Sequence, residues 1–215
     1  MVITAMFAAL AYVVMFFIRI PIMPAAPYLE YDPKDVLFVI TGFLIGPVQG
    51  TVSVILVCLL EMVTVSKSGP IGLLMNVIAS LFFVLPASLI YYRKKTLISA
   101  IIGLIAGMLS MSGAMILWNY LITPLYAGMP REAIVPMLPT VFLPFNMIKA
   151  GINMAITLLI YKPISIVLHR SGLLPKEEKE TKKEGDSGKF SPLAIILGIL
   201  MLGGCICAIF LIKNR

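Results

Sequence analysis

The sequence predicts an all-α integral membrane protein. Hydrophobic residues make up 60% of the 215 residues and charged residues only 13%, about half of the share that a soluble domain carries. Polar side chains are therefore too few to cover a water-exposed surface. The apolar runs are unbroken, as at 71–89 and 98–117, which does not match the alternating pattern of a membrane β-barrel and favours helices, whose backbone hydrogen bonds are satisfied internally.

The first third of the chain is expected to hold three helices and one long loop. An apolar run at 2–18 predicts the first helix. Four prolines in the stretch 19–33 forbid a helix there. Because this stretch is still apolar, it is expected to be a loop packed on the protein or the membrane. The run 36–60 is interrupted at 46–50 by Gly-Pro-Val-Gln-Gly, which favours two shorter helices joined by a tight turn over one long helix.

Three further apolar runs are expected as helices, at 71–92, 97–126 and 134–161. They complete a six-helix membrane core at residues 1–168. The polar stretch 169–190 is rich in Lys and Glu, cannot bury a core, and is expected to be a charged cytoplasmic linker. This linker is expected to separate the core from an additional C-terminal transmembrane helix at 191–215.

Basic residues set the expected orientation in the membrane. Two crossings separate the cluster at 93–95 from the lysines of the linker, so both lie on one side. The excess of Lys and Arg in cytoplasmic loops makes that side cytoplasmic. The N-terminus is then cytoplasmic and the loop 19–33 external. The same excess explains the net charge of +7, and no basic face with interleaved aromatic residues indicates a nucleic-acid partner.

Polar side chains inside the apolar runs are costly and therefore mark candidate functional positions. Asn146, Lys149 and Asn153 have the spacing i, i+3 and i+7, which places them on one helical face. Lys149 lies ten residues after Pro139, roughly 15 Å at the rise of an α-helix, or about half of the hydrocarbon core. Such a lysine requires a partner. The two candidates are Glu61, in a structural ion pair, and the acceptor atoms of a bound ligand.

Three other polar residues, Glu61, Asn76 and Asn119, lie near the expected outer ends of their helices. The inner halves of the neighbouring helices hold nothing more polar than Ser or Thr. This asymmetry argues against a pore and favours a cup that opens to the outside above an apolar floor. Amides donate and accept hydrogen bonds, so they suit a ring edge with alternating donors and acceptors. Taken alone, Asn76 and Asn119 are equally explained by bonds to a neighbouring helix.

Two stretches resemble a known family. The sequence Tyr-Leu-Glu-Tyr-Asp-Pro-Lys-Asp at 28–35, followed by the helix break at 46–50, is similar to the substrate-binding S components of energy-coupling-factor (ECF) vitamin transporters. Among these it is most similar to the riboflavin-specific members. Asn-Met-Ile-Lys at 146–149 also resembles their ligand-binding helix. The resemblance covers about residues 1–170 and leaves the linker and the last helix outside it.

The resemblance implies a six-helix subunit of the bacterial cell membrane that binds riboflavin from outside with high affinity, as a transported ligand and not as a cofactor. The implied partners are a transmembrane coupling subunit and two cytoplasmic ATPases. Ala5 and Ala9, whose spacing lets another helix approach closely, match the family's contact with the coupling subunit. Asn119, Asn146 and Lys149 would bind the flavin ring, and the first loop and the start of the fourth helix would close over it. The expected substrate-binding residues are Leu29, Glu30, Tyr31, Gly72, Asn76, Asn119, Asn146, Lys149 and Asn153.

Other functions are weighed against this one. An S component for another vitamin, such as thiamine or biotin, would share the general features, and a purely structural membrane subunit is a further alternative. A membrane-embedded enzyme needs paired catalytic groups or a metal set. The chain has one histidine, and Glu61 is expected to be the only acid clearly inside a helix, so neither an enzyme nor a metal site is expected. The sequence also has no G-x-x-x-x-G-K-[ST] phosphate loop, so the chain is not expected to hydrolyse ATP.

Overall fold

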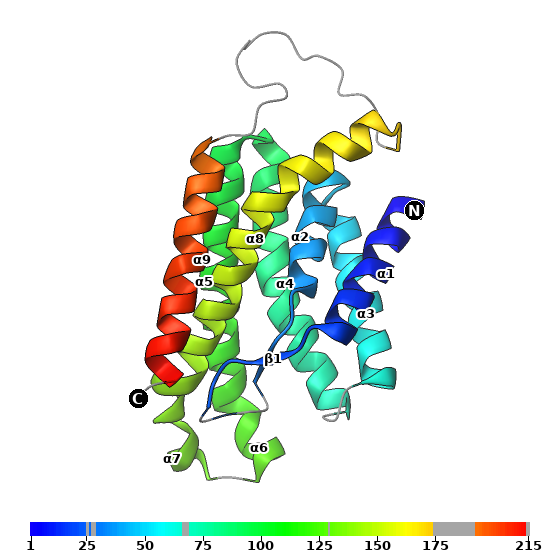
Figure 1. Cartoon of the computed structure of the whole chain (residues 1–215). Coiled ribbons are helices and arrows are strands. Elements are labelled where there is room, and N and C mark those ends of the chain that lie inside the picture. The colour runs from blue at the N-terminus through cyan, green and yellow to red at the C-terminus, as the bar shows by residue number, and fades with distance from the viewer. Residues whose placement is uncertain (25, 27–28, 66–68, 129, 174–191, 214–215) are drawn as a thin grey trace.

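The computed structural model describes residues 1–24, 26, 29–65, 69–128, 130–173 and 192–213. Six helices form a bundle, as expected (Figure 1): α1 (Val2–Phe17), α2 (Lys34–Leu44), α3 (Pro47–Thr64), α4 (Gly69–Lys94), α5 (Leu97–Leu121) and α8 (Leu143–Arg170). A seventh, α9 (Pro192–Lys213), lies beside this bundle. Most of the predicted linker lies outside the described residues.

The apolar run 36–60 is divided between two helices, as its Gly-Pro interruption predicts. Helix α2 ends at Leu44 and α3 begins at Pro47. Between them Gly46 has a φ of 141°, a conformation that side chains rarely adopt. A Cβ on Gly50 would lie 3.1 Å from the Cα of Gly42, so the start of α3 packs closely against α2. With 11 residues, α2 is about 16 Å long, too short to cross a membrane by itself.

The helices expected at 97–126 and 134–161 have different limits in the structure. Helix α5 ends at Leu121, and α8 begins only at Leu143 and continues to Arg170. The connection holds three short helical segments: α6 (Thr123–Ala127), α7 (Arg131–Ile134) and a π-helical turn, η1 (Leu138–Phe142). Four prolines between 123 and 140 explain the interruption, because proline lacks the N–H that a continuous helix needs.

The proline-rich stretch between α1 and α2 is not helical, as expected. It contains two short strands, β1 (Ile20–Pro21) and β2 (Glu30–Tyr31), which pair in antiparallel fashion with Ile20 opposite Tyr31. The strand pair lies at the end of the bundle that also holds α6 and α7 (Figure 1). It is the only strand pair within the described residues.

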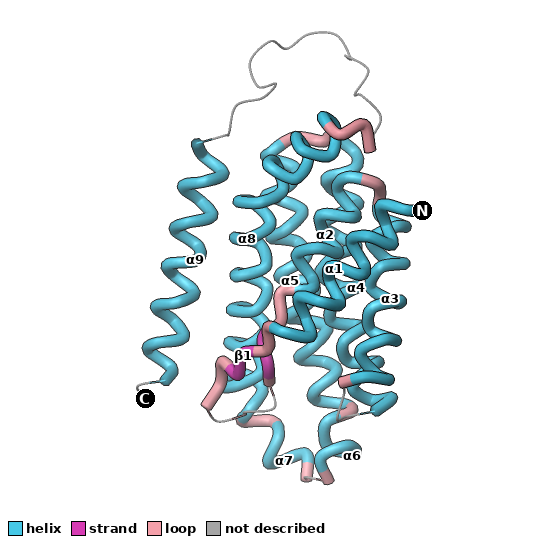
Figure 2. Tube along the Cα trace, turned by 45° about the vertical axis from the view of Figure 1, so that its right-hand side comes forward, coloured by secondary structure: helices cyan, strands magenta, loops and turns pink. Residues whose placement is uncertain are grey.

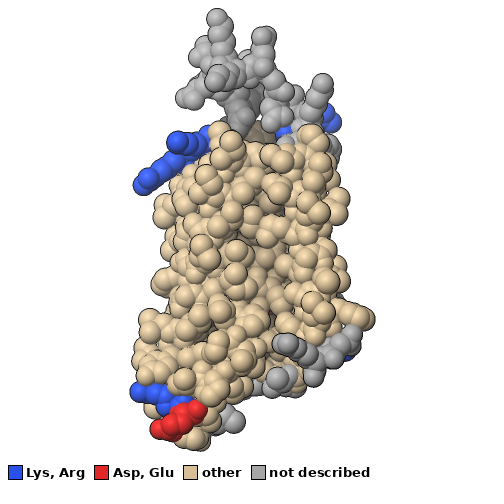
Figure 3. Space-filling view, turned by 90° about the vertical axis from the view of Figure 1, so that its left-hand side faces the viewer, with Lys and Arg blue, Asp and Glu red and all other residues tan. Residues whose placement is uncertain are grey.

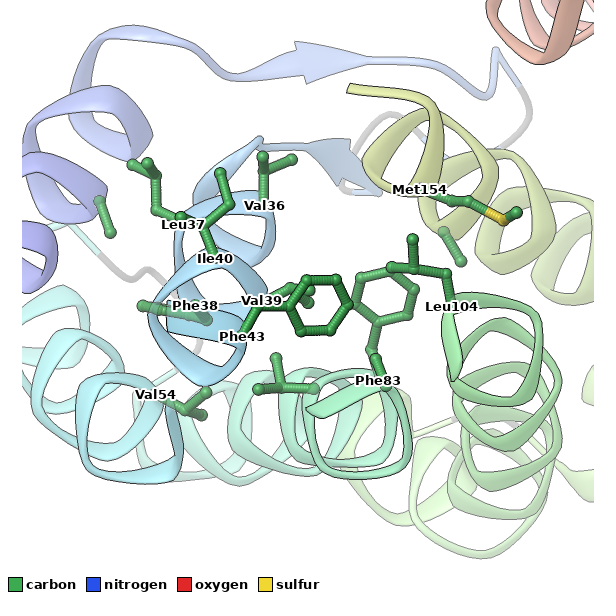
Figure 4. Close-up of a cluster of buried hydrophobic side chains, with 14 of the residues drawn as sticks. Val36, Leu37, Phe38, Val39, Ile40, Phe43, Val54, Phe83, Leu104 and Met154 are labelled. Atoms are coloured by element: carbon green, nitrogen blue, oxygen red, sulfur yellow. The ribbon is translucent and has the colours of Figure 1, made fainter. Parts of the chain in front are cut away.

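The core of the bundle is apolar and lies where α2 meets α4, α5 and α8. Figure 4 shows Phe83 and Leu104 gathered beside Phe43 and Val39 of α2. All four side chains are buried. This apolar packing agrees with the apolar floor predicted below the cup from the lack of strongly polar residues in the inner halves of the helices.

The outer surface of the bundle is suited to lipid. Figure 3 shows a broad uncharged band, with charged side chains near the two ends of the visible face. Within the described part of the chain, five helical segments are long and apolar enough to cross a membrane: Pro47–Thr64, Gly69–Lys94, Leu97–Leu121, Arg131–Arg170 and Pro192–Lys213. These features confirm the predicted all-α multi-pass membrane protein.

Candidate ligand-binding site

A cavity of about 520 Å³ lies at the end of the bundle that carries the strand pair. The first turns of α4 and α8, the last turns of α3 and α5, and the stretch between α1 and α2 enclose it. The basic residues Arg93 and Lys94 lie in the last turn of α4, at the opposite end of the bundle. The cavity is therefore a one-sided cup, as the distribution of polar residues predicts.

Seven of the nine predicted substrate-binding residues line this cavity. They are Leu29, Glu30, Gly72, Asn76, Asn119, Asn146 and Lys149. The other two, Tyr31 and Asn153, are buried behind the wall, and the Tyr31 hydroxyl donates to Oδ1 of Asn153 over 3.0 Å. Asn146, Lys149 and Asn153 lie on the continuous helix α8, where their spacing places them on one face, and all three are buried.

Two asparagines are held in fixed orientations at the cavity wall. Nδ2 of Asn146 donates to the carbonyl of Phe142 over 2.8 Å, and Nδ2 of Asn119 donates to the carbonyl of Met115 over 2.7 Å. The Thr123 hydroxyl donates to Oδ1 of Asn119 over 2.9 Å. Each amide has a second N–H group and an oxygen with two lone pairs. The two side chains therefore keep hydrogen-bonding capacity for a ligand.

Apolar side chains complete the wall. Phe145 supplies an aromatic ring, and Met75, Met111 and Met115 supply flexible thioethers, which adapt to irregular shapes and pack well against aromatic rings. A flat ring system with a polar edge matches this combination of a soft apolar wall and fixed amides.

Lys149 has protein partners that the sequence did not suggest. Its Nζ lies 3.1 Å from Oδ2 of Asp32 and 4.0 Å from Oδ2 of Asp35. Of the two candidate partners, Glu61 is not paired with Lys149 in this structure, because Glu61 binds Arg19 and Lys34 instead. The loop before α2 folds back over the cavity and delivers Asp32 to the face of α8.

Lys34 and Arg19 extend the ion pairs across the bundle. The Lys34 side chain is 0% exposed, and its Nζ lies 3.0 Å from Oδ2 of Asp32 and 3.1 Å from Oε2 of Glu61. Arg19, which follows α1, approaches Glu61 to 2.8 Å and Glu30 to 3.6 Å. Buried charges require such pairing, since an isolated buried ion is strongly unfavourable.

Asp35 is a second acid inside a helix, so the expectation that Glu61 would be the only one is wrong. This carboxylate is fully buried in α2 and accepts from the Ser80 hydroxyl over 2.5 Å and from Nδ2 of Asn153 over 3.3 Å. Through Asn153 it is linked to Tyr31 of strand β2. Asp35 thus anchors the wall behind the cavity.

Opposite charges are nearly balanced around the cavity. Burial raises the pKa of Asp32, but the ammonium groups of Lys149 and Lys34 outweigh this effect and hold the pKa of the carboxyl well below its usual range. Three cations face four carboxylates in the network: Arg19, Lys34 and Lys149 against Glu30, Asp32, Asp35 and Glu61. Such a site suits a neutral polar ligand better than a strongly charged one. Among the described residues, no group of three His, Cys, Asp or Glu side chains could hold a metal ion.

Sequence reasoning missed the contributions of Arg19, Asp32, Lys34 and Asp35. A signal was present, because all four are charged residues in or beside an otherwise apolar stretch between two apolar helices. Their separation from Lys149 in the sequence concealed the contact.

Some alanines of α1 are exposed and others are buried. Ala5 and Ala9 are exposed, whereas Ala8 and Ala11 are buried against the rest of the bundle. Because both exposed side chains are small, another helix could approach this face of α1 closely.

Comparison with known proteins adds a family match to this geometry. The family described as "ECF transporter, substrate-specific component" matches residues 1–165. The riboflavin transporter RibU of Staphylococcus aureus (strain TCH60) is 30% identical over 172 residues, which cover 77% of this chain and 90% of that protein. The riboflavin transporter FmnP of Bacillus subtilis (strain 168) is 28% identical over 170 residues, covering 75% of this chain and 89% of that protein. A solved structure of the S component of a bacterial ECF transporter has a TM-score of 0.64 and 32% identity, over 77% of this chain and 94% of that one.

Proposed function

The chain belongs to the family of ECF transporter substrate-specific components, and we propose that it is the riboflavin-binding subunit of such an importer. The family and the relatives are transporter components, so the chain is not an enzyme. The observation that carries the proposal is the cavity, where fixed amides and Lys149 meet an apolar wall in a chain whose relatives are riboflavin transporters. Its volume of about 520 Å³ lies within the usual range for small-molecule pockets.

The chemistry of riboflavin matches the cavity wall. One edge of its ring system carries two carbonyls on either side of an N–H group, and the rest of the ring is flat and largely apolar. Asn119, Asn146 and Lys149 are assigned to that polar edge, because amides and an ammonium group can supply its donors and acceptors. Phe145 and the methionines are assigned to the ring faces.

The remaining predicted residues are assigned to the cover and frame of the site. Leu29, Glu30 and Gly72 line the cavity from the loop and from the start of α4. Asn76 adds a further amide to the wall. Tyr31 and Asn153 act from behind, by holding strand β2 against α8. Riboflavin is the transported ligand in this proposal and not a cofactor.

Transport requires partners, because the chain has no phosphate loop of its own. The partners assigned to it are a membrane-embedded coupling subunit and two cytoplasmic ATPases, with the exposed Ala5 and Ala9 in contact with the coupling subunit. The N-terminus is assigned to the cytoplasm, on the side of Arg93 and Lys94, because basic residues favour that side. The cavity then opens to the outside of the cell membrane.

Purification of the full chain from riboflavin-containing medium tests the proposal. Bound flavin should give the protein a visible absorption band and a yellow colour. Titration of the ligand-free protein should quench flavin fluorescence at about one flavin per chain, which is the capacity of one pocket. A parallel titration with thiamine and biotin tests whether the chain binds one of these vitamins instead. Tight binding of one of these without flavin quenching would contradict the riboflavin assignment and retain the family.

A further inference from the structure

Helix α9 packs closely along α8, although the family match ends at residue 165, before α9 begins. Figure 2 shows α9 running beside α8 over most of its length. Two glycines allow this approach. A Cβ on Gly151 of α8 would lie 2.9 Å from Sγ of Cys205, and a Cβ on Gly198 of α9 would lie 2.8 Å from Cγ of Leu159. The two helices therefore approach each other closely at two positions along their length.

The C-terminal half of α9 also packs against an apolar cluster beside the strand pair. Four of its residues are half-buried against an apolar cluster that includes parts of the stretch between α1 and α2: Cys205, Ala208, Ile209 and Ile212. The cluster residues from that stretch are Ile22, Met23, Ala26, Leu29 and Tyr31. The remaining cluster residues come from α7, the turn η1 and the first half of α8. One side of α9 thus packs against the same apolar cluster as the segment that covers the cavity.

The same cluster reaches the candidate site directly. Leu29 and Phe145 belong to the cluster and also line the cavity. Tyr31 belongs to the cluster and donates to Asn153 on α8. Displacement of the cluster would therefore move cavity-lining side chains.

Three other residues in the same half of α9 are not among the side chains packed against this cluster: Ile206 is 62% exposed, and Phe210 and Leu211 are each 66% exposed. Ile206 and Ile209 are the same residue type on the same helix, three residues apart, but of the two only Ile209 packs against the cluster. This pair offers a matched comparison.

We propose that α9 is a positioning element of the binding site, which holds strand β2 and Leu29 in place against α8 and so retains the bound ligand. The proposal rests on the proposed function only for the identity of that ligand, riboflavin. The positioning residues are the four that pack against the cluster: Cys205, Ala208, Ile209 and Ile212.

The physical basis is packing rather than escape from water. A two-stranded pair is marginal by itself and needs support from other elements. In a membrane, lipid tails are as apolar as the side chains of α9, so the gain comes from close contact between complementary surfaces. A shortened side chain at position 209 removes such contacts from the cluster and leaves a void beside the strand pair.

The test compares Ile209→Ala with Ile206→Ala in the full chain, in detergent or lipid nanodiscs. The first measurement is amide hydrogen exchange in the ligand-free protein, at 20–24 and 29–31. Ile209→Ala should speed exchange there, while Ile206→Ala should match the wild-type protein. The second is the riboflavin dissociation rate, which should rise about three- to tenfold in Ile209→Ala with little change in the association rate, as is usual for lost contacts. Ile209→Leu should restore most of the wild-type rate.

Each possible outcome of these two measurements tests a different part of the proposal. Unchanged exchange in Ile209→Ala would overturn the role of α9 in holding the strand pair. Faster exchange with an unchanged dissociation rate would overturn the positioning role at the site. Equal effects of Ile206→Ala and Ile209→Ala would also overturn it, because the effect would not depend on packing against the cluster. If the wild-type protein bound no riboflavin, the proposed function would fail, and the exchange measurement would still decide whether α9 positions the strand pair.

Discussion

Nζ of Lys149 lies 3.1 Å from Oδ2 of Asp32, although 117 residues separate them in the chain. Both residues line the cavity. Asp32 has a second cation, because Nζ of Lys34 lies 3.0 Å from the same oxygen. Lys149 can therefore turn toward a ligand without leaving a buried carboxylate unpaired, which reconciles a structural ion pair with a binding role.

Replacement of Lys149 tests that binding role. Lys149→Met keeps the length of the side chain and removes its charge. Folding should persist because Lys34 still neutralises Asp32. Riboflavin affinity should fall by roughly tenfold or more, since a hydrogen bond to a charged group contributes about 1.5–3 kcal/mol. Fluorescence titration of the purified variant measures this change. An unchanged affinity, or a variant that fails to fold, would contradict the binding role.

Lys34 is predicted to act on stability. Lys34→Met removes the cation that Asp32 and Glu61 share, although Asp32 keeps Lys149 and Glu61 keeps Arg19. The loss should therefore be smaller than the roughly 3–5 kcal/mol that follows when a buried charge is left without a partner. The free energy of unfolding in mixed detergent micelles should fall accordingly. Lys94→Met, at an exposed position near the end of α4, is the matched control and should change little.

A second substitution checks the mechanism of this loss. Glu61→Gln in the Lys34→Met background removes one of the two carboxylates that lost a cation, so the double variant should recover part of the lost stability. The two single variants and the double variant form a cycle that isolates their interaction. Strictly additive effects would show that Lys34 and Glu61 do not interact in the folded protein.

Arg19 is predicted to link strand β2 to α3. It contacts Glu61 at 2.8 Å and the half-exposed Glu30 at 3.6 Å. Arg19→Gln should weaken riboflavin binding by roughly three- to tenfold, because the exposed contact with Glu30 contributes little and the contact with Glu61 contributes more. Arg131→Gln removes the same charge at an exposed site beside Tyr120. Similar affinities for both variants would show that only the net charge matters.

The alanines of α1 are predicted to separate binding from transport. Ala5→Trp or Ala9→Trp places a bulky side chain on the exposed face of α1, where it blocks close approach of a partner helix. Riboflavin uptake by cells should fall strongly while binding by the isolated chain persists. Ala8→Trp, on the buried face, should impair both. Parallel loss of uptake and binding in Ala5→Trp would show that this face packs inside the subunit.

Much of the fold follows from local features of the sequence. The break at Gly46 and Pro47 divides α2 from α3 because glycine adopts the positive φ and proline begins the next helix. The limits of α5 and α8 were less predictable. The apolar runs extend to residue 126 and resume at 134, but prolines convert 122–142 into short segments whose exact ends depend on packing.

The sequence by itself determined the membrane class, the six helices of the core and the face of α8 that carries Asn146, Lys149 and Asn153. These three features depend on composition and on the spacing of residues a few positions apart, so they can be inferred from short stretches of sequence. The tertiary structure alone decided which charges meet. Asp32 rather than Glu61 faces Lys149 because the short stretch between α1 and α2 folds back over the cavity. The tertiary structure also decided that α9 packs against a cluster that includes part of that stretch, since contacts between distant segments depend on how helices pack and not on local pattern.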